Sequence, residues 1–129
     1  MLRFGRGDIE YYMTGACPYF AIALHKLTGW PLAMLTDDAQ SWESGVGVEE
    51  YPFIAHVFVV TPDEKGLDIK GPRPLPAIKA EYHDLIEPRI EIVGLSELRA
   101  LMGDLKPLCR YDAREIKEAM ALAEKLLAS

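Results

Sequence analysis

The chain has 129 residues, 50% of them hydrophobic, and its 20 acidic side chains outnumber 14 basic ones to give a net charge of -6. This length predicts a single domain over residues 1–129 that buries enough surface to fold without a metal or a disulfide. The acidic balance argues against nucleic acid or an anionic membrane as a partner, because both attract clustered Lys and Arg.

The first element with clear signals is a helix that begins at Cys17 or Pro18 and ends at Gly29. Proline suits the first turn of a helix, because its missing N–H would have no partner there. Gly29 followed by Pro31 is a strong stop signal. Residues 19–24 are apolar on nearly all sides of the helix, so we expect it to be buried.

The middle of the chain alternates between β-rich segments and breaks. Short strands are expected at 32–35, 54–60, 67–70 and 89–93. The acidic stretch 36–52 between the first two is expected to be a loop or irregular insertion. A turn at 61–66 makes the next two strands a hairpin, and the proline-rich segment 71–76 is expected to break regular structure.

The C-terminal third is helical in pattern. Ser96 is expected to cap a short helix that ends at Gly103. Asp112 is expected to cap a longer one, with Glu115 three residues on as in a capping box. Apolar residues then follow at helical spacing: Ile116, Ala119, Met120, Ala123, Leu126 and Leu127. The sequence therefore predicts an α+β fold, with a buried N-terminal helix on a small antiparallel sheet and further helices at the C-terminus.

Nothing in the sequence indicates secretion or a membrane span. No apolar stretch follows the first residues, and the longest apolar runs, 19–24 and 53–60, are far shorter than the ~20 residues that cross a bilayer. The two cysteines, Cys17 and Cys109, are too far apart for a zinc pair and too few for a disulfide framework. We expect a soluble, cytoplasmic protein.

Cys17 is the strongest candidate for chemistry. A thiolate is a nucleophile, and the unpaired N–H groups at a helix start stabilise it and can contribute to an oxyanion hole. The alternative is that Cys17 is a small buried hydrophobic residue, which is the more common role of a cysteine before an apolar helix.

His56 and Asp68 are the candidate partners of Cys17. His56 interrupts an apolar strand, and Asp68 lies between Leu67 and Ile69, where a lone buried carboxylate would be costly. If the hairpin pairs even positions with even positions, the two side chains share one face of the sheet. Asp68 would then bind one nitrogen of the His56 ring and orient the ring, while the other ring nitrogen takes the proton of Cys17. The alternative is a hydrogen-bonded core histidine with a structural Asp68.

These segments resemble a known superfamily. Gly15-x-Cys17 with its apolar helix, the His56 strand and Gly66-Leu67-Asp68 look like the core of papain-like and transglutaminase-like thiol hydrolases, including the NlpC/P60 amidases. The resemblance covers residues 14–71. It implies that Cys17 is the nucleophile, His56 the general base and acid, and Asp68 the orienting residue of a catalytic triad.

Four further residues are candidates for substrate or oxyanion contacts. Tyr11 and Tyr12 precede Cys17 at the distance where papain-like enzymes often place an oxyanion-hole side chain, although packing is the more common role of such tyrosines. Trp42, in the acidic stretch, is expected to line a cleft. Arg73, just after Asp68, is a candidate contact for an anionic group of a substrate. No catalytic role is expected for the remaining candidates, His25, His83, Trp30 and Cys109.

The leading hypothesis is a cysteine peptidase, amidase, deamidase or transglutaminase-like acyl transferase that acts without a cofactor on a protein, peptide or small amide. The first alternative is a catalytically inactive papain-like domain that serves as a protein-binding module. The second is a metal site formed by Cys17, His56 and Asp68 with His25 or His83, which no paired ligand spacing supports. An open cleft at Cys17 would favour the enzyme, and a covered thiol would favour the binding module.

Overall fold

The structure, a computed structural model, describes residues 4–43, 50–104 and 109–129. Those residues form five helices and one five-stranded sheet in the order β4-β3-β2-β1-β5, with every neighbouring pair antiparallel. The α+β class expected from the sequence is confirmed. The elements in chain order are α1 (Arg6–Met13), α2 (Cys17–Thr28), β1 (Leu32–Glu43), β2 (Glu50–Val60), β3 (Lys65–Asp68), β4 (Gly71–Pro74), α3 (Leu75–Glu81), β5 (Pro88–Val93), α4 (Leu95–Asp104) and α5 (Ala113–Ala128).

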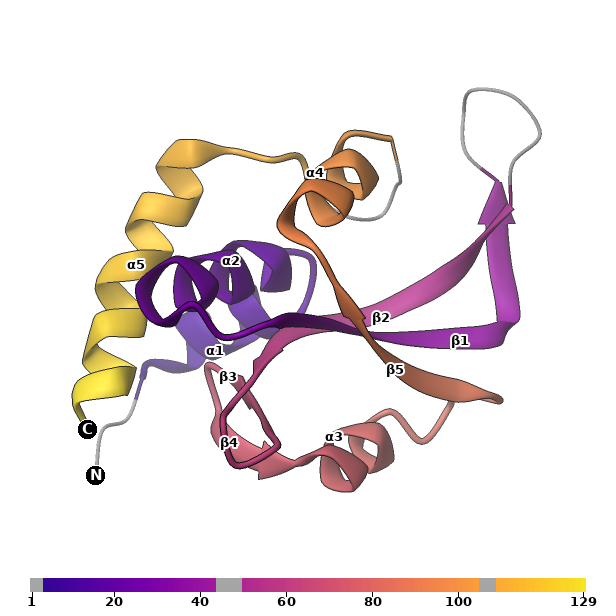
Figure 1. The fold of residues 1–129 in the computed structure, drawn as a ribbon, viewed down its shortest axis with the longest axis horizontal. Coiled ribbons are helices and arrows are strands. Elements are labelled where there is room, and N and C mark those ends of the chain that lie inside the picture. The colour runs from indigo at the N-terminus through magenta and orange to yellow at the C-terminus, as the bar shows by residue number, and fades with distance from the viewer. Residues whose placement is uncertain (1–3, 44–49, 105–108) are drawn as a thin grey trace.

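A hydrophobic core lies on each face of the sheet. Figure 1 shows α2, α4 and α5 on one side of the sheet and α3 on the other. Because side chains alternate along a strand, Leu32 and Met34 of β1 join the larger core, whereas Ala33 and Leu35 join the smaller one. The larger core is completed by side chains of α1, α2, α4 and α5, and the smaller one by α3 through the buried Ile78. We call the two sides the α2 face and the α3 face.

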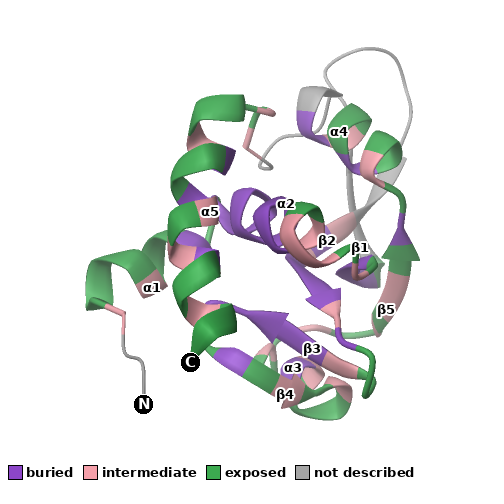
Figure 2. Cartoon of the chain, turned by 60° about the vertical axis from the view of Figure 1, so that its left-hand side comes forward, coloured by how far each residue is buried: buried purple, intermediate pink, exposed green. Residues whose placement is uncertain are grey.

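Helix α2 forms as the sequence predicts. Pro18 lies in its first turn, and Gly29 ends it in the left-handed conformation, with φ 76°, while its N–H donates to the His25 carbonyl at 2.7 Å. The residues from Cys17 to Leu24 are all buried, which Figure 2 shows as the purple helix between α5 and the sheet. The helix is therefore the centre of the larger core.

The acidic stretch 36–52 is more regular than expected. β1 continues to Glu43 and β2 begins at Glu50, so the prediction of an irregular insertion is wrong at both ends of the stretch; residues 44–49 lie outside the described part of the chain. Near the start of the stretch, Asp37 is fully buried, and its carboxylate accepts hydrogen bonds from the backbone N–H groups of Ile86 and Glu87, each at 2.9 Å. An acidic residue of the expected loop thus joins β1 to a distant part of the chain.

The proline-rich segment 71–76 was also expected to lack regular structure, and this prediction is wrong. It forms edge strand β4 and the start of α3. Prolines are tolerated at a sheet edge, where a missing N–H costs no ladder bond, and Pro76 lies in the first turn of α3, where the N–H needs no partner.

The C-terminal helix confirms its predicted cap. The Asp112 side chain accepts hydrogen bonds from the backbone N–H groups of Arg114 and Glu115 at 2.9 and 3.3 Å. α4 begins one residue before Ser96, so Ser96 lies inside the helix and does not precede it. Among the described residues, no helix has both the length and the apolar character that crossing a bilayer requires.

Candidate active site

His56 and Asp68 form a direct, buried pair on the α3 face. His56 Nε2 lies 2.8 Å from Asp68 Oδ2. Val59 opposes Leu67 and Val60 opposes Gly66, and continuing this register places Asp68 opposite Phe58 and diagonal to His56. The shared face that the sequence predicts for the two side chains is what the hairpin register produces.

The pair defines which nitrogen of His56 carries hydrogen. An ionised carboxylate only accepts hydrogen bonds, so Nε2 is the donor and, in the neutral ring, Nδ1 is the basic nitrogen. The ring is fully buried and lies between Phe58 and Tyr82, each with its centroid 5.7 Å away. Nδ1 has no hydrogen-bond partner within the described residues. A buried nitrogen of this kind normally costs about 1–3 kcal/mol, so its presence calls for an explanation.

Asp68 is held in its ionised form. Burial alone would raise its pKa, but the hydrogen bond from His56, the His56 and Arg73 charges and the Lys70 backbone N–H outweigh burial and lower it. The Lys70 N–H donates to Asp68 Oδ1 at 2.9 Å, and the Arg73 guanidinium contacts Oδ2. Asp68 is therefore equipped to orient the His56 ring and to balance a charge on it.

Arg73 is committed to carboxylates of this chain. Its guanidinium pairs with both Asp68 and Glu81, and Glu81 also accepts from Lys70 Nζ at 3.0 Å. These contacts tie β4 and α3 to the buried pair. They leave Arg73 engaged, so the structure does not present it as a free contact for an anionic substrate.

Cys17 reaches the same region from the α2 face. It is the first residue of α2, belongs to the larger core, and its sulfur accepts a hydrogen bond from the Val57 backbone, in the peptide that follows His56. A negative charge on this sulfur would be repelled by the charges of Asp68 and of an ionised Tyr82. In the part of the chain that the structure describes, however, no hydrogen bond joins the Cys17 thiol to the His56 ring.

The Cys17 thiol is neutral in this arrangement. Burial is the largest influence, and with the charges of Cys109 and Asp68 it raises the pKa of Cys17 from 9.0 to about 12, although hydrogen bonds from the Val57 backbone and its own backbone act in the lowering direction. The sequence-based expectation that the helix start lowers this pKa is wrong here, because desolvation of the sulfur outweighs the helix N–H groups.

The two tyrosines before Cys17 are used for packing. Tyr11 donates its hydroxyl to Glu115 Oε2 of α5 at 2.9 Å, and Tyr12 is buried with its ring 5.3 Å from that of Phe20. Both contacts connect α1 to the helices of the larger core. The structure does not place either hydroxyl against Cys17.

The remaining sequence candidates lie apart from the pair. His25 Nδ1 contacts the Trp30 carbonyl at 2.7 Å, His83 is exposed, and Cys109 is half-buried beside the Tyr19 hydroxyl. The Trp42 backbone pairs with Tyr51 at the far end of β1, but the Trp42 side chain lies outside what the structure describes. The prediction that Trp42 lines a cleft is therefore not tested by the described residues.

Tyr82 is the site residue that sequence reasoning missed. It follows α3 directly and its ring covers His56, at an interplanar angle of 31°. Burial first, and then the charges of Cys17 and Asp68, raise the pKa of its hydroxyl, while Arg73 acts in the opposite direction. No local pattern indicates a role for Tyr82, because the prolines at 72, 74 and 76 predict neither the strand β4 nor the helix α3 that precedes Tyr82.

The pair and the thiol are covered rather than set in a cleft. Cys17, His56 and Asp68 are 5, 0 and 3% exposed, and none of them lines either of two pockets of the described structure, one beside β5 and one beside the end of α5. Within the described residues, no group of three or more His, Cys, Asp or Glu side chains is placed to hold a metal ion.

Comparisons with known proteins add no family to this picture. No protein-family model, no curated protein and no solved structure matches the chain. The features that bear on function are therefore the His56–Asp68 pair, the thiol near it and the surfaces around them.

Proposed function

We propose that this chain is a small thiol hydrolase or acyl transferase with Cys17 as nucleophile, His56 as general base and acid, and Asp68 as orienting residue. The observation that carries the proposal is the unpartnered, buried Nδ1 of His56 in a ring whose other nitrogen is fixed by Asp68. A structural histidine gains stability when both nitrogens are bonded, whereas a catalytic base must keep one free for the reacting proton.

The reaction follows from these atoms. Cys17 Sγ bonds to the carbonyl carbon of an amide as His56 Nδ1 takes the thiol proton. That proton then passes to the departing nitrogen, the C–N bond breaks and a thioester remains. Water, or a second amine in a transferase, then attacks the thioester carbonyl carbon and gives a proton to His56 Nδ1. His56 Nδ1 returns this proton to the sulfur as the C–S bond breaks.

In the resting structure the Cys17 thiol is not in position to react. With its pKa raised to about 12, the covered thiol of Cys17 holds its proton at neutral pH. Cys17 belongs to the core of the α2 face and the His56 ring lies on the α3 face, so catalysis requires a movement on substrate binding that both uncovers the sulfur and brings it to Nδ1. We infer that the substrate is a protein, a peptide or a small amide, as the papain-like resemblance implies.

A second candidate is favoured by the covered thiol itself. A catalytically inactive papain-like domain that binds another protein needs no accessible Cys17, and two pockets of the described structure are lined by other residues. In this alternative the His56–Asp68 pair only fastens β3 to β2.

Acyl transfer from p-nitrophenyl acetate distinguishes the two. The chain has two cysteines, so Cys109→Ser leaves Cys17 alone and Cys17→Ser leaves Cys109 alone. For the enzyme we expect intact mass to show acetylation of Cys17 at neutral pH faster than of Cys109, with the Cys17 rate lost in His56→Gln and reduced in Asp68→Asn.

The opposite result is equally informative. If Cys109 reacts first and neither substitution slows Cys17, the result contradicts an assembled Cys17–His56–Asp68 triad and favours the binding module. Circular dichroism of each variant confirms that the fold is retained, and Asp68→Asn, which conserves the shape of the side chain and one of its two acceptor oxygens, provides the comparison if His56→Gln unfolds.

A further inference from the structure

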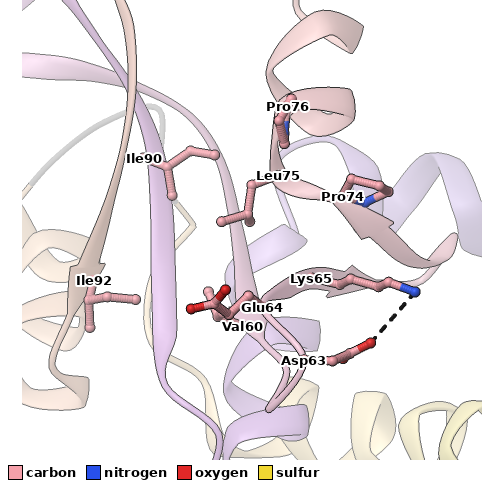
Figure 3. Close-up of a pocket in the computed structure, with 9 residues that line it drawn as sticks. All are labelled: Val60, Asp63, Glu64, Lys65, Pro74, Leu75, Pro76, Ile90 and Ile92. Carbon is pink, nitrogen blue, oxygen red and sulfur yellow. Dashed lines mark ion pairs between the residues drawn. The ribbon is translucent and has the colours of Figure 1, made fainter.

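A pocket of about 600 Å³ opens on the α3 face, away from Cys17 (Figure 3). It lies between the turn joining β2 to β3, the junction of β4 with α3, and edge strand β5. Its apolar lining comes from Val60, Leu75, Ile90 and Ile92, with two prolines beside them. Ile92 is 61% exposed, which is unusual for a large aliphatic side chain and leaves apolar surface open to a partner.

One carboxylate at this pocket has no counter-ion. Figure 3 shows the Glu64 side chain directed across the pocket toward Ile92, and no ion pair or hydrogen bond engages its carboxylate within the described residues. Its neighbours Asp63 and Lys65 pair with each other at 3.6 Å and so offset one another. The rim is therefore net negative beside an aliphatic surface, and this combination complements the aliphatic stem and charged end of a Lys or Arg side chain.

The backbone of Glu64 adds a second observation. Its φ is 63°, and it is the only residue other than glycine with a positive φ within the described residues. Glycine or asparagine would adopt this left-handed conformation at lower cost, so the turn geometry does not account for a glutamate here. A role for the carboxylate in recognition does account for it.

Strand β5 supplies the backbone half of a docking site. It pairs with β1 on one side and is the last strand of the described sheet on the other, so its outer N–H and C=O groups are open to an added strand. Ile90 and Ile92 are two positions apart and project to the same face, which is the face of the pocket. A strand added along β5 would direct alternate side chains toward that pocket.

We propose that β5 and this pocket bind an extended, basic peptide segment. The segment pairs with the outer edge of β5, and a Lys or Arg side chain lies along Ile90, Ile92 and Leu75 with its charge on Glu64. Val60, the pocket residue on β2, is four positions from His56, roughly 13 Å along a strand. The binding is thus separate from any reaction at Cys17, and it is tested in a Cys17→Ser background.

Fluorescence anisotropy with a labelled octapeptide of alternating Lys and Val measures the binding. We expect this peptide to bind, and the matched peptide of alternating Glu and Val not to bind. Glu64→Gln should weaken binding about fivefold, which is the upper range for one exposed ion pair. Added salt should lower the affinity of the wild-type protein for the peptide toward that of Glu64→Gln. Ile92→Thr should also weaken binding, because it removes apolar contact and keeps a β-branched side chain.

Two matched variants control for general effects of charge and apolar surface. Glu124→Gln removes an exposed carboxylate on α5, and Ile86→Thr removes an exposed isoleucine outside the pocket. Both should bind the Lys-Val peptide as the wild type does. Glu64→Gly tests the backbone argument, since it should raise the free energy of unfolding and still lose binding.

Three results would overturn the proposal. The first is equal affinity for the Lys-Val and Glu-Val peptides, and the second is an effect of Glu64→Gln or Ile92→Thr no larger than that of its control. The third is a concentration-dependent dimer in sedimentation that Ile92→Thr abolishes, which would assign the β5 edge to a second copy of the chain. Circular dichroism verifies the fold of each variant.

Discussion

His56 and Asp68 are joined at 2.8 Å between Nε2 and Oδ2, and both are buried at the centre of the hairpin that links β2 to β3. The Asp68 carboxylate also accepts hydrogen bonds from the Arg73 guanidinium and the Lys70 N–H. One carboxylate of β3 thus contacts side chains of both neighbouring strands, β2 and β4. The pair is thus part of the folding core as well as a candidate for catalysis, and stability measurements can separate its two roles.

Replacing Asp68 with alanine should destabilise the protein strongly. The change leaves the His56 ring and the Arg73 guanidinium without their shared carboxylate, and removing one partner of a buried ion pair costs about 3–5 kcal/mol. Urea denaturation should show this loss, a smaller one for Asp68→Asn, and almost none for Asp84→Ala at an exposed site. A loss from Asp68→Ala no greater than from Asp84→Ala would contradict the role of the pair.

Acid should weaken the fold through the same carboxylate. The pKa of Asp68 is lowered from 3.8 in the folded protein, so the unfolded chain binds its proton first and the stabilisation is complete only above that value. As the pH falls below 3.8 the stability advantage of the wild type over Asp68→Asn should shrink. Urea titrations of both proteins across this range measure the difference, and a constant gap would show that the carboxylate is not selectively ionised in the fold.

Alkali should weaken the fold through Cys17. Its pKa is raised from 9.0 to about 12, so between these values the folded protein retains a proton that the unfolded chain has lost. Stability is therefore lost as the pH rises above 9.0, by up to about 1.4 kcal/mol per pH unit. Cys17→Ala lacks this loss, and comparison of the two proteins cancels the similar effect of the tyrosines. A parallel pH dependence for both would indicate an accessible thiol.

Gly66 should not tolerate a methyl group. A Cβ at this position of β3 would lie 2.1 Å from Ile78 Cδ1 and 3.1 Å from the Phe58 ring, and both side chains are fully buried. Gly66→Ala should cost about 1–3 kcal/mol by overpacking the smaller core. Gly15→Ala is the matched control, because a Cβ there meets nothing within 4 Å. Thermal unfolding compares the two, and equal melting temperatures would refute the close approach.

The cap of α5 should be worth about 1 kcal/mol. Asp112→Ala removes the acceptor of the Arg114 and Glu115 N–H groups, the typical effect of losing a side-chain cap. Asp112→Asn should restore most of the stability, since an amide oxygen accepts the same hydrogen bonds. Chemical denaturation of both variants, with Glu124→Ala as the control for charge removal, measures the effect.

Local patterns predicted the parts of the fold that local interactions determine. Gly29 and Asp112 were found because a left-handed helix end and a side-chain cap depend on residues within a few positions. His56 and Asp68 were found because strand alternation and a tight hairpin fix their shared face. The two residues are 12 positions apart in the sequence, but the short turn between β2 and β3 fixes how their strands pair, so local residues determine the contact.

The missed features depend on distant partners. Asp37 is buried because the backbone at residues 86 and 87, some fifty positions later, supplies its hydrogen bonds. Tyr82 covers His56 only because α3 folds back under the sheet, and the burial that raises the pKa of Cys17 comes from packing of the whole larger core. None of these leaves a signal in neighbouring residues.

The prolines of β4 have a consequence for self-association. Pro72 and Pro74 alternate with Gly71 and Arg73, and because proline cannot donate to the ladder with β3, its nitrogen faces outward. That border of the sheet offers no donor at either proline, while the opposite border at β5 is open. A strand added at β4 would lack two of the donors it needs, so we expect strand-by-strand stacking of identical copies, which requires both borders, to be disfavoured.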